Sequence, residues 1–147
     1  MIAPVPLVNR DMAVGQDFVQ TPEHFTLVVE EAPWWQSWLG QSSVVHIEPG
    51  ARLYGVSAVF APLGLTAELE HRWEIRENGN WRVVYRNRFH SSGGRERGFR
   101  GYSWVLDPKP GRWRFIVGTQ DGRTIGLLNL NIRHGDPRTE PRVERVF

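Results

Sequence analysis

The stretch ELEHRWEIRENGNWRVVYRNRFH, residues 68–90, decides the fold of this chain. Its first half alternates strictly, with Leu69, His71, Trp73 and Ile75 on one face and charged side chains on the other, as expected of a half-buried strand. Asn78-Gly79-Asn80 then predicts a tight turn. In the second arm, alternation predicts one face of Trp81, Val83, Tyr85, Asn87 and Phe89 and an opposite face of Arg82, Val84, Arg86, Arg88 and His90. The two arms should pair as an antiparallel hairpin.

Side-chain alternation and turn residues also predict strands before and after this hairpin. Residues 112–119 and 123–133, joined by Asp121-Gly122, predict a second hairpin, and residues 43–48 and 52–60, separated by Pro49-Gly50, predict a third. A strand over residues 25–29 should lead into an irregular or single-turn helical segment at residues 34–39.

Many short strands separated by Gly, Pro and Asn turns, with no long helix among them, indicate an all-β protein. We expect an antiparallel β-sandwich, immunoglobulin-like in the loose sense, of about seven to nine strands. Residues 1–134 should form a single sandwich domain, and residues 135–147, polar with two prolines, should form a C-terminal tail.

The composition excludes several classes of protein. Among 147 residues there is no cysteine, so disulfides, thiolate catalysis and zinc–thiolate sites are excluded. No apolar run reaches the roughly 18 residues of a membrane-spanning helix, so we expect no transmembrane segment. Residues 1–8 lack the charged start and long apolar region of a signal peptide, which leaves a cytoplasmic location open.

The charges are unevenly distributed. Residues 82–114 carry nine basic and two acidic side chains, whereas residues 1–60 carry two basic and six acidic ones. Arg86, Arg88, Arg95 and Arg97 are therefore candidates for binding an anionic partner or surface. The alternative, which we favour, is structural: these arginines form ion pairs with carboxylates of the same protein. The candidate partners are Glu68, Glu70, Glu74 and Glu77.

The segment Pro33 to Gly40 crowds Trp34, Trp35 and Trp38 together without clear periodicity. The simplest interpretation is a plug that packs over the open end of the sandwich. Two functional alternatives remain, namely recognition of a sugar or partner protein, and anchoring at a membrane interface. The three tryptophans are therefore candidate ligand- or surface-binding residues.

The sequence offers no template for catalysis. The five histidines show no metal-ligand spacing, no Gly-x-Ser-x-Gly elbow occurs, and Ser91 to Arg95 lack the Lys-Ser/Thr ending of a phosphate loop. We therefore expect no metal, no cofactor and no catalytic residues. Nucleic acid is also disfavoured, because the predicted alternation places many aromatics opposite the arginines.

The stretch from Leu53 to Arg133 resembles domain-of-unknown-function family 2914. The motifs that carry the resemblance are LYGVSAV (53–59), APLGL (61–65), HRW (71–73), GGR (93–95), GFRGYSW (98–104) and GRWR (111–114). The resemblance implies an extracytoplasmic β-domain of bacterial envelope or membrane proteins, without an established catalytic role. Its marker residues here are His71, Trp73, Arg100, Ser103 and Trp113.

Three of these markers are candidates for a structural role or a site. We expect the imidazole of His71 to bond a neighbouring backbone group beside the buried indole of Trp73. Arg100 should tie a glycine-rich loop to a carboxylate such as Glu70. Ser103 follows in the same motif.

The sequence thus predicts a non-catalytic binding or interaction module of a bacterial envelope protein, periplasmic or envelope-located by resemblance. Its partner would be an unknown protein, a glycan or an anionic membrane surface; the sequence does not determine the oligomeric state. The alternative is a small-molecule or sugar-active hydrolase with a site in the sandwich cleft. A deep cleft in which His71, Arg100 and a carboxylate converge would favour it.

Overall fold

A computed structural model describes residues 8–22, 24–31, 42–60, 66–92 and 99–147. These residues form eleven strands and one 3-10 turn, η1 (Pro137–Thr139). The strands are β1 (Val8–Gly15), β2 (Asp17–Gln20), β3 (Phe25–Glu30), β4 (Ser43–Ile47), β5 (Arg52–Phe60), β6 (Thr66–Glu77), β7 (Asn80–Ser92), β8 (Phe99–Leu106), β9 (Gly111–Thr119), β10 (Thr124–His134) and β11 (Arg142–Val146). The predicted all-β sandwich is confirmed, with more strands than the turn signals indicated.

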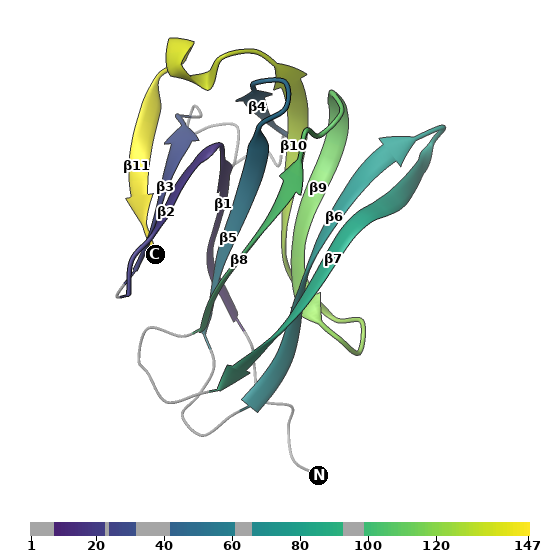
Figure 1. Cartoon of the computed structure of the whole chain (residues 1–147). Helices are drawn as coiled ribbons and strands as arrows, with labels where there is room; N and C mark the ends of the chain where they lie inside the picture. The colour runs from purple at the N-terminus through teal and green to yellow at the C-terminus, as the bar shows by residue number, and fades with distance from the viewer. Residues whose placement is uncertain (1–7, 23, 32–41, 61–65, 93–98) are drawn as a thin grey trace.

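The strands form three sheets, in the orders β1-β5-β8, β4-β10-β9-β6-β7 and β11-β3-β2. Figure 1 shows them as three layers, with the β1-β5-β8 sheet between the other two. The middle sheet and the five-stranded sheet enclose the main core, whose most buried side chains include Trp73, Phe115, Leu53 and Ile132.

The other face of the middle sheet packs against the third sheet. Ala13 and Val56 of the middle sheet meet Leu27 of β3 in a second, smaller core, with Phe18 and Tyr102 beside it. A middle sheet must therefore be apolar on both faces, as fully buried sheets are. This requirement explains the nearly continuous burial along β5, where both Leu53 and Val56 are inaccessible to solvent.

The hairpin that decides the fold is confirmed. β6 and β7 pair antiparallel across a two-residue turn in which Asn78 and Gly79 both have positive φ angles, of 52° and 79°. Such turns favour asparagine and glycine, because these residues adopt left-handed backbone angles at low cost. Leu69, Trp73 and Ile75 are buried, as the alternation predicted.

The second predicted hairpin, β9 with β10, is also confirmed, but the third is wrong. β4 belongs to the five-stranded sheet, where it pairs parallel to β10, while β5 pairs with β1 and β8 in the middle sheet. The Pro49-Gly50 turn therefore carries the chain from one layer to the next. Local turn chemistry does not reveal this, because a turn between two sheets uses the same residues as a turn within one.

The C-terminal residues are not a simple polar tail, so that expectation is corrected. β11 pairs antiparallel with β3, and Phe147 packs against the second core. Backbone hydrogen bonds hold this segment in place. Phe25 and Phe147 each donate a backbone N–H to the other's carbonyl oxygen, at 3.0 and 2.8 Å. All side chains of β11 except that of Arg145 are exposed, so the strand is held mainly through its backbone.

The predicted faces of β7 are wrong for its first half, because the strand contains a β-bulge. Tyr85 lies opposite Trp73 and Val83 opposite Glu74, so Val84 is the extra residue. An extra residue exchanges the faces of everything before it. Trp81 and Val83 therefore lie on the outer face with Arg86, and not on the face of Tyr85.

The two main sheets approach each other closely at Gly55, where there is no room for a side chain. A Cβ added to Gly55 would lie 2.6 Å from an indole carbon of Trp73 and 2.7 Å from a ring carbon of Phe115. We expect Gly55→Ala to lower the free energy of unfolding by roughly 1–3 kcal/mol, because overpacking a dense core forces side chains apart. Urea unfolding monitored by tryptophan fluorescence measures this.

A second substitution tests the cause. In the background of Phe115→Leu, which removes part of the obstructing ring, Gly55→Ala should be less destabilising than in the wild-type protein. If the two effects were simply additive, the Phe115 ring would not be part of the obstruction.

Candidate functional site

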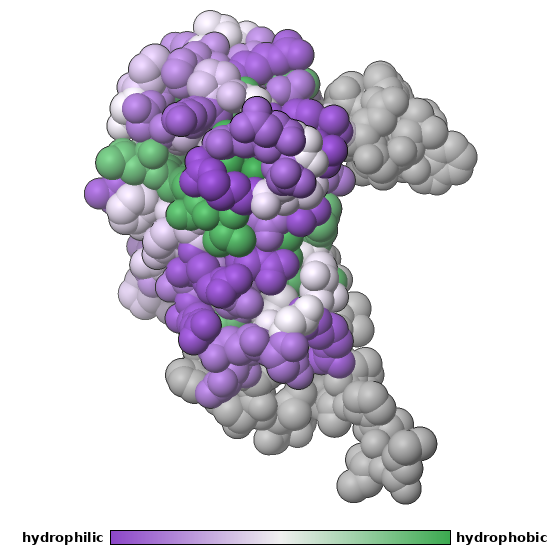
Figure 2. Space-filling view, turned by 90° about the vertical axis from the view of Figure 1, so that its right-hand side faces the viewer, coloured by the Kyte–Doolittle hydropathy of each residue, from purple (hydrophilic) through white to green (hydrophobic). Residues whose placement is uncertain are grey.

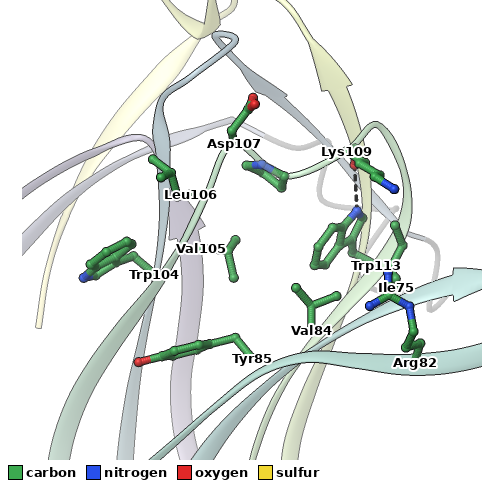
Figure 3. A pocket seen from close by; sticks show the side chains of 11 residues that line it. Ile75, Arg82, Val84, Tyr85, Trp104, Val105, Leu106, Asp107, Lys109 and Trp113 are labelled. Carbon is green, nitrogen blue, oxygen red and sulfur yellow. Dashed lines mark hydrogen bonds between the residues drawn. The ribbon is translucent and has the colours of Figure 1, made fainter.

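A hollow lies between the edge strands of the two main sheets, β7 and β8. It has a volume of about 390 Å³ and a mostly apolar lining that includes Ile75, Val84, Tyr85, Trp104 and Leu106. Figure 3 shows Tyr85 and Trp104 along one side of this hollow and Trp113 with Ile75 on the other. Its volume is within the range of small-ligand pockets.

Several large hydrophobic side chains at this hollow are exposed. Val84 and Tyr85 on β7 and Trp104 and Leu106 on β8 have exposed fractions of 41, 42, 36 and 62%. A view onto the side of the molecule that carries β6 and β7 shows hydrophobic residues gathered between hydrophilic residues above and below (Figure 2). Contiguous exposed apolar groups in a hollow are typical of interaction sites.

The bulge in β7 contributes directly to this lining. Val84 and Tyr85 are adjacent in the chain, and regular alternation would place them on opposite faces. Because Val84 is the extra residue, both line the hollow. Bulges commonly redirect a side chain in this way beside binding sites.

A second hollow, of about 430 Å³, continues along β8 from Tyr85 and Trp104, which line both. Its other lining residues are more polar and include Asn87, Arg100 and Ser103. Together the two hollows follow the edge of β8, apolar toward Leu106 and polar toward Arg100. An elongated ligand with an apolar end and a polar end would match this lining.

Behind the hollow lies a buried network centred on His71. Its Nε2 atom lies 2.7 Å from the Ser57 hydroxyl of β5, and its Nδ1 atom lies 2.8 Å from the Ser103 hydroxyl of β8. The Trp73 indole N–H also donates to the Ser103 hydroxyl, at 2.8 Å. His71 was predicted to be buried, but its two serine partners come from strands that pattern analysis could not bring together.

This network is poorly suited to nucleophilic catalysis. Burial lowers the pKa of His71 to about 3, so its imidazole is neutral and weakly basic near neutral pH. A serine nucleophile requires a base whose pKa lies near the working pH, oriented by a third group such as a carboxylate. The partners of the ring here are two hydroxyls, and His71 is fully buried.

The described contacts of Arg100 lie on the third sheet. Its Nη1 atom donates to the carbonyl oxygen of Phe147 at 2.7 Å, and its guanidinium lies over the Phe25 ring. Glu70 instead binds Arg86, with 2.9 Å between Nε and Oε2, and lies 3.9 Å from Arg72. Arg100 therefore ties β8 to the third sheet, whereas the ring nitrogens of His71 face the main core.

The outer face of the five-stranded sheet holds the candidate arginines. Arg86 and Arg88 are exposed on β7. Arg86 forms an ion pair with Glu70, as the structural alternative predicted. Glu70 and Glu74 are buried, each with an exposed fraction of only 5%. Arginine side chains on three strands cover them: Arg72 lies 3.1 Å and Arg114 2.5 Å from Glu74.

The remaining candidate residues, Trp34, Trp35, Trp38, Arg95 and Arg97, lie outside the described residues, so their roles stay predictions. Trp104 lines the hollow, and the guanidinium of Arg52 lies 4.2 Å from its ring centroid. The sequence pattern did not predict this hollow, because it reveals neither the bulge in β7 nor the position of the β7 edge beside the β8 edge. Within the described ranges, no three or more acidic or histidine side chains group as metal ligands do.

Comparison with known proteins identifies no family. No protein-family model matches the chain, and no curated protein matches it. An immunoglobulin-like protein from Pseudomonas aeruginosa is similar in structure, with 10% identity and a TM-score of 0.44 over 88% of this chain and 98% of that one. A β-glucosidase from Listeria innocua (8% identity, TM-score 0.36) is matched over 76% of this chain but 16% of its own. A β-glucosidase from Bifidobacterium adolescentis (6% identity, TM-score 0.35) is matched over 83% of this chain and 17% of its own.

The burial of His71 predicts a pH dependence of stability. The unfolded chain binds a proton at this residue below a pH of about 6.5, whereas the folded protein does not until about 3. The free energy of unfolding should therefore fall by about 1.4 kcal/mol for each pH unit below 6.5, through this group alone. Urea unfolding of the wild type and of His71→Gln, at about pH 7 and about pH 5, isolates the contribution.

Equal pH slopes in the two proteins would contradict this assignment. If His71→Gln does not fold, NMR of the wild type provides the same test, because the ring signals of His71 should not titrate over that range. A titration midpoint near 6.5 would then be the contradicting result.

The buried carboxylates on the outer face generate a further prediction. Glu74→Gln removes the charge that holds two arginines, and we expect it to lower the free energy of unfolding by roughly 1–3 kcal/mol. The matched control is Glu77→Gln, which breaks the exposed pair with Arg82 and should change stability little. Thermal unfolding of both variants at low salt measures the difference; comparable losses would refute the distinction.

Proposed function

We propose that this chain is a non-catalytic binding module and that its ligand occupies the hollow between β7 and β8. The observation that carries the proposal is the placement of two strand edges face to face, with exposed Tyr85, Trp104 and Leu106 between them. Binding sites are typically concave and mainly apolar, with a few polar groups that orient the ligand. Asn87 and Arg100, which line the polar hollow, would serve as those groups.

The setting in a bacterial envelope protein is a second part of the proposal. It is supported by the resemblance of residues 53–133 to an envelope-associated family. None of the described residues forms a helix long and apolar enough to cross a membrane. Fractionation of cells that express the protein from its own gene tests this part; recovery only in the cytoplasmic fraction would contradict it.

The binding proposal is tested by selection with a random-peptide display library and a panel of soluble oligosaccharides. Ligands selected on the wild type are compared on Val84→Asp/Leu106→Asp, which places charges in the hollow. The control is Val143→Asp/Val146→Asp, which changes two exposed valines of β11. We expect roughly tenfold or greater weakening by the first pair only, since each lost apolar contact costs about 1 kcal/mol or more.

Two results would overturn the assignment of the hollow. One is a set of selected ligands that bind all three proteins equally. The other is a hydrolytic activity toward a bound oligosaccharide that the hollow variant abolishes, which would replace a binding module with an enzyme.

A further inference from the structure

The outer face of β6, β7 and β9 forms a surface that the hollow does not use. Within the described strands it presents six arginines and three glutamates, a net charge of +3. We call this surface the arginine face. Its arginines are Arg72, Arg76, Arg86, Arg88, Arg112 and Arg114.

Two glutamates beneath the arginines hold them in place. The Arg114 Nε atom donates a hydrogen bond to Glu74 at 2.5 Å. The Nε atoms of Arg86 and Arg72 form ion pairs with Glu70 and Glu74, at 2.9 and 3.1 Å. A guanidinium has a second edge of N–H donors, formed by its terminal nitrogens, that can bind another carboxylate or sulfate. The terminal donors of Arg114 are thus oriented in advance, because the buried Glu74 carboxylate accepts a hydrogen bond from its Nε atom.

The other three arginines have no carboxylate partner among the residues described. Arg76, Arg88 and Arg112 are all exposed. Since Ile75 lies opposite Trp113, the antiparallel register places Arg76 directly opposite Arg112. Like charges directly opposite one another destabilise a sheet, and a bound anion would relieve this repulsion.

The spacing of the arginines describes a strip. Arg88 lies opposite Glu70 and Arg112 opposite Arg76, so the two arginines are six residues apart along β6, or about 20 Å. Across the three strands the surface is about 10 Å wide. Beside the strip, Asn129 lies opposite Arg114 and Asn131 opposite Arg112, both on β10. Amides next to guanidinium groups can bind a chain that carries both hydroxyl and acidic groups.

We propose that the arginine face binds an acidic polysaccharide, a linear chain bearing carboxylates or sulfates among its hydroxyls. The proposal goes beyond the module described above, because the arginine face and the hollow lie on opposite faces of β6 and β7, and either site can fail alone.

Two other polyanions fit this surface less well. Single-stranded nucleic acid favours exposed aromatic faces for stacking, but the half-buried Trp81 has the Arg114 guanidinium 4.3 Å from its ring centroid. An anionic bilayer favours cationic groups that project from the protein, whereas Glu70 and Glu74 hold three of these arginines against the sheet.

Binding to immobilised alginate and dextran sulfate, with neutral dextran as the uncharged control, tests the proposal. The variant Arg76→Gln/Arg88→Gln/Arg112→Gln removes arginines that hold no glutamate, so no buried carboxylate is left unpaired. Arg123→Gln/Arg138→Gln/Arg142→Gln removes the same charge away from the arginine face. Circular dichroism and the thermal midpoint of both variants establish that each is folded.

We expect the wild type and the control variant to bind both acidic polysaccharides and not dextran, with affinities that fall as salt is added. The first variant should bind roughly tenfold more weakly or worse, since three exposed charge contacts are lost. Equal weakening in both variants would mean that only net charge matters, and would overturn the proposal. Tighter binding of the wild type to single-stranded poly-dT or to phosphatidylglycerol vesicles than to alginate would also overturn it.

Discussion

The imidazole of His71 connects three strands from two sheets, and the arrangement of the main sandwich depends on this connection. Its ring bonds Ser57 of β5 and Ser103 of β8, and Ser103 also accepts the indole N–H of Trp73. Buried polar groups without partners destabilise a protein, so these groups are satisfied only when the two sheets lie in one relative position. Hydrophobic contact alone would let the two sheets shift relative to each other, whereas this hydrogen-bond network permits little shift. At Gly55 the adjacent backbone comes within contact of the Trp73 and Phe115 rings, which requires a residue without a side chain.

That anchored contact lies toward one edge of the sandwich and determines what happens beyond it. β8 is held to β6 through Ser103, but β7 extends past β6 as an unpaired edge in the described sheet. The two edge strands therefore face one another across a hollow, with no further strand between them. The bulge at Val84 turns an additional apolar side chain toward this hollow. The same bulge turns Trp81 to the outer face, where Arg114 covers its ring.

The two faces of β6 illustrate how one strand serves two environments. Its inner face carries Leu69, His71 and Trp73 into the core, and its outer face carries Glu70 and Glu74. Arginine side chains lie against those carboxylates, so the outer face carries a compact layer of charge over the sheet. Charged groups removed from water must be paired, and each of these carboxylates lies near two guanidinium groups. Ion pairing within the protein and a positively charged surface are therefore compatible, because there are more arginines than glutamates.

The sequence by itself determined the strand pattern, the inward residues of β6 and the turn at Asn78-Gly79, because side-chain alternation and turn geometry are local properties of the chain. The tertiary structure alone decided that Pro49-Gly50 joins two layers, that residues 142–146 complete a third sheet, and that Val84 is bulged. Each depends on which distant strand supplies the hydrogen-bond partners, and a period of two carries no information about that choice. Candidate sites follow the same division. The arginines were recognisable as a group from their density, but the burial of Glu70 and the hollow between β7 and β8 arise only when strands far apart in sequence meet.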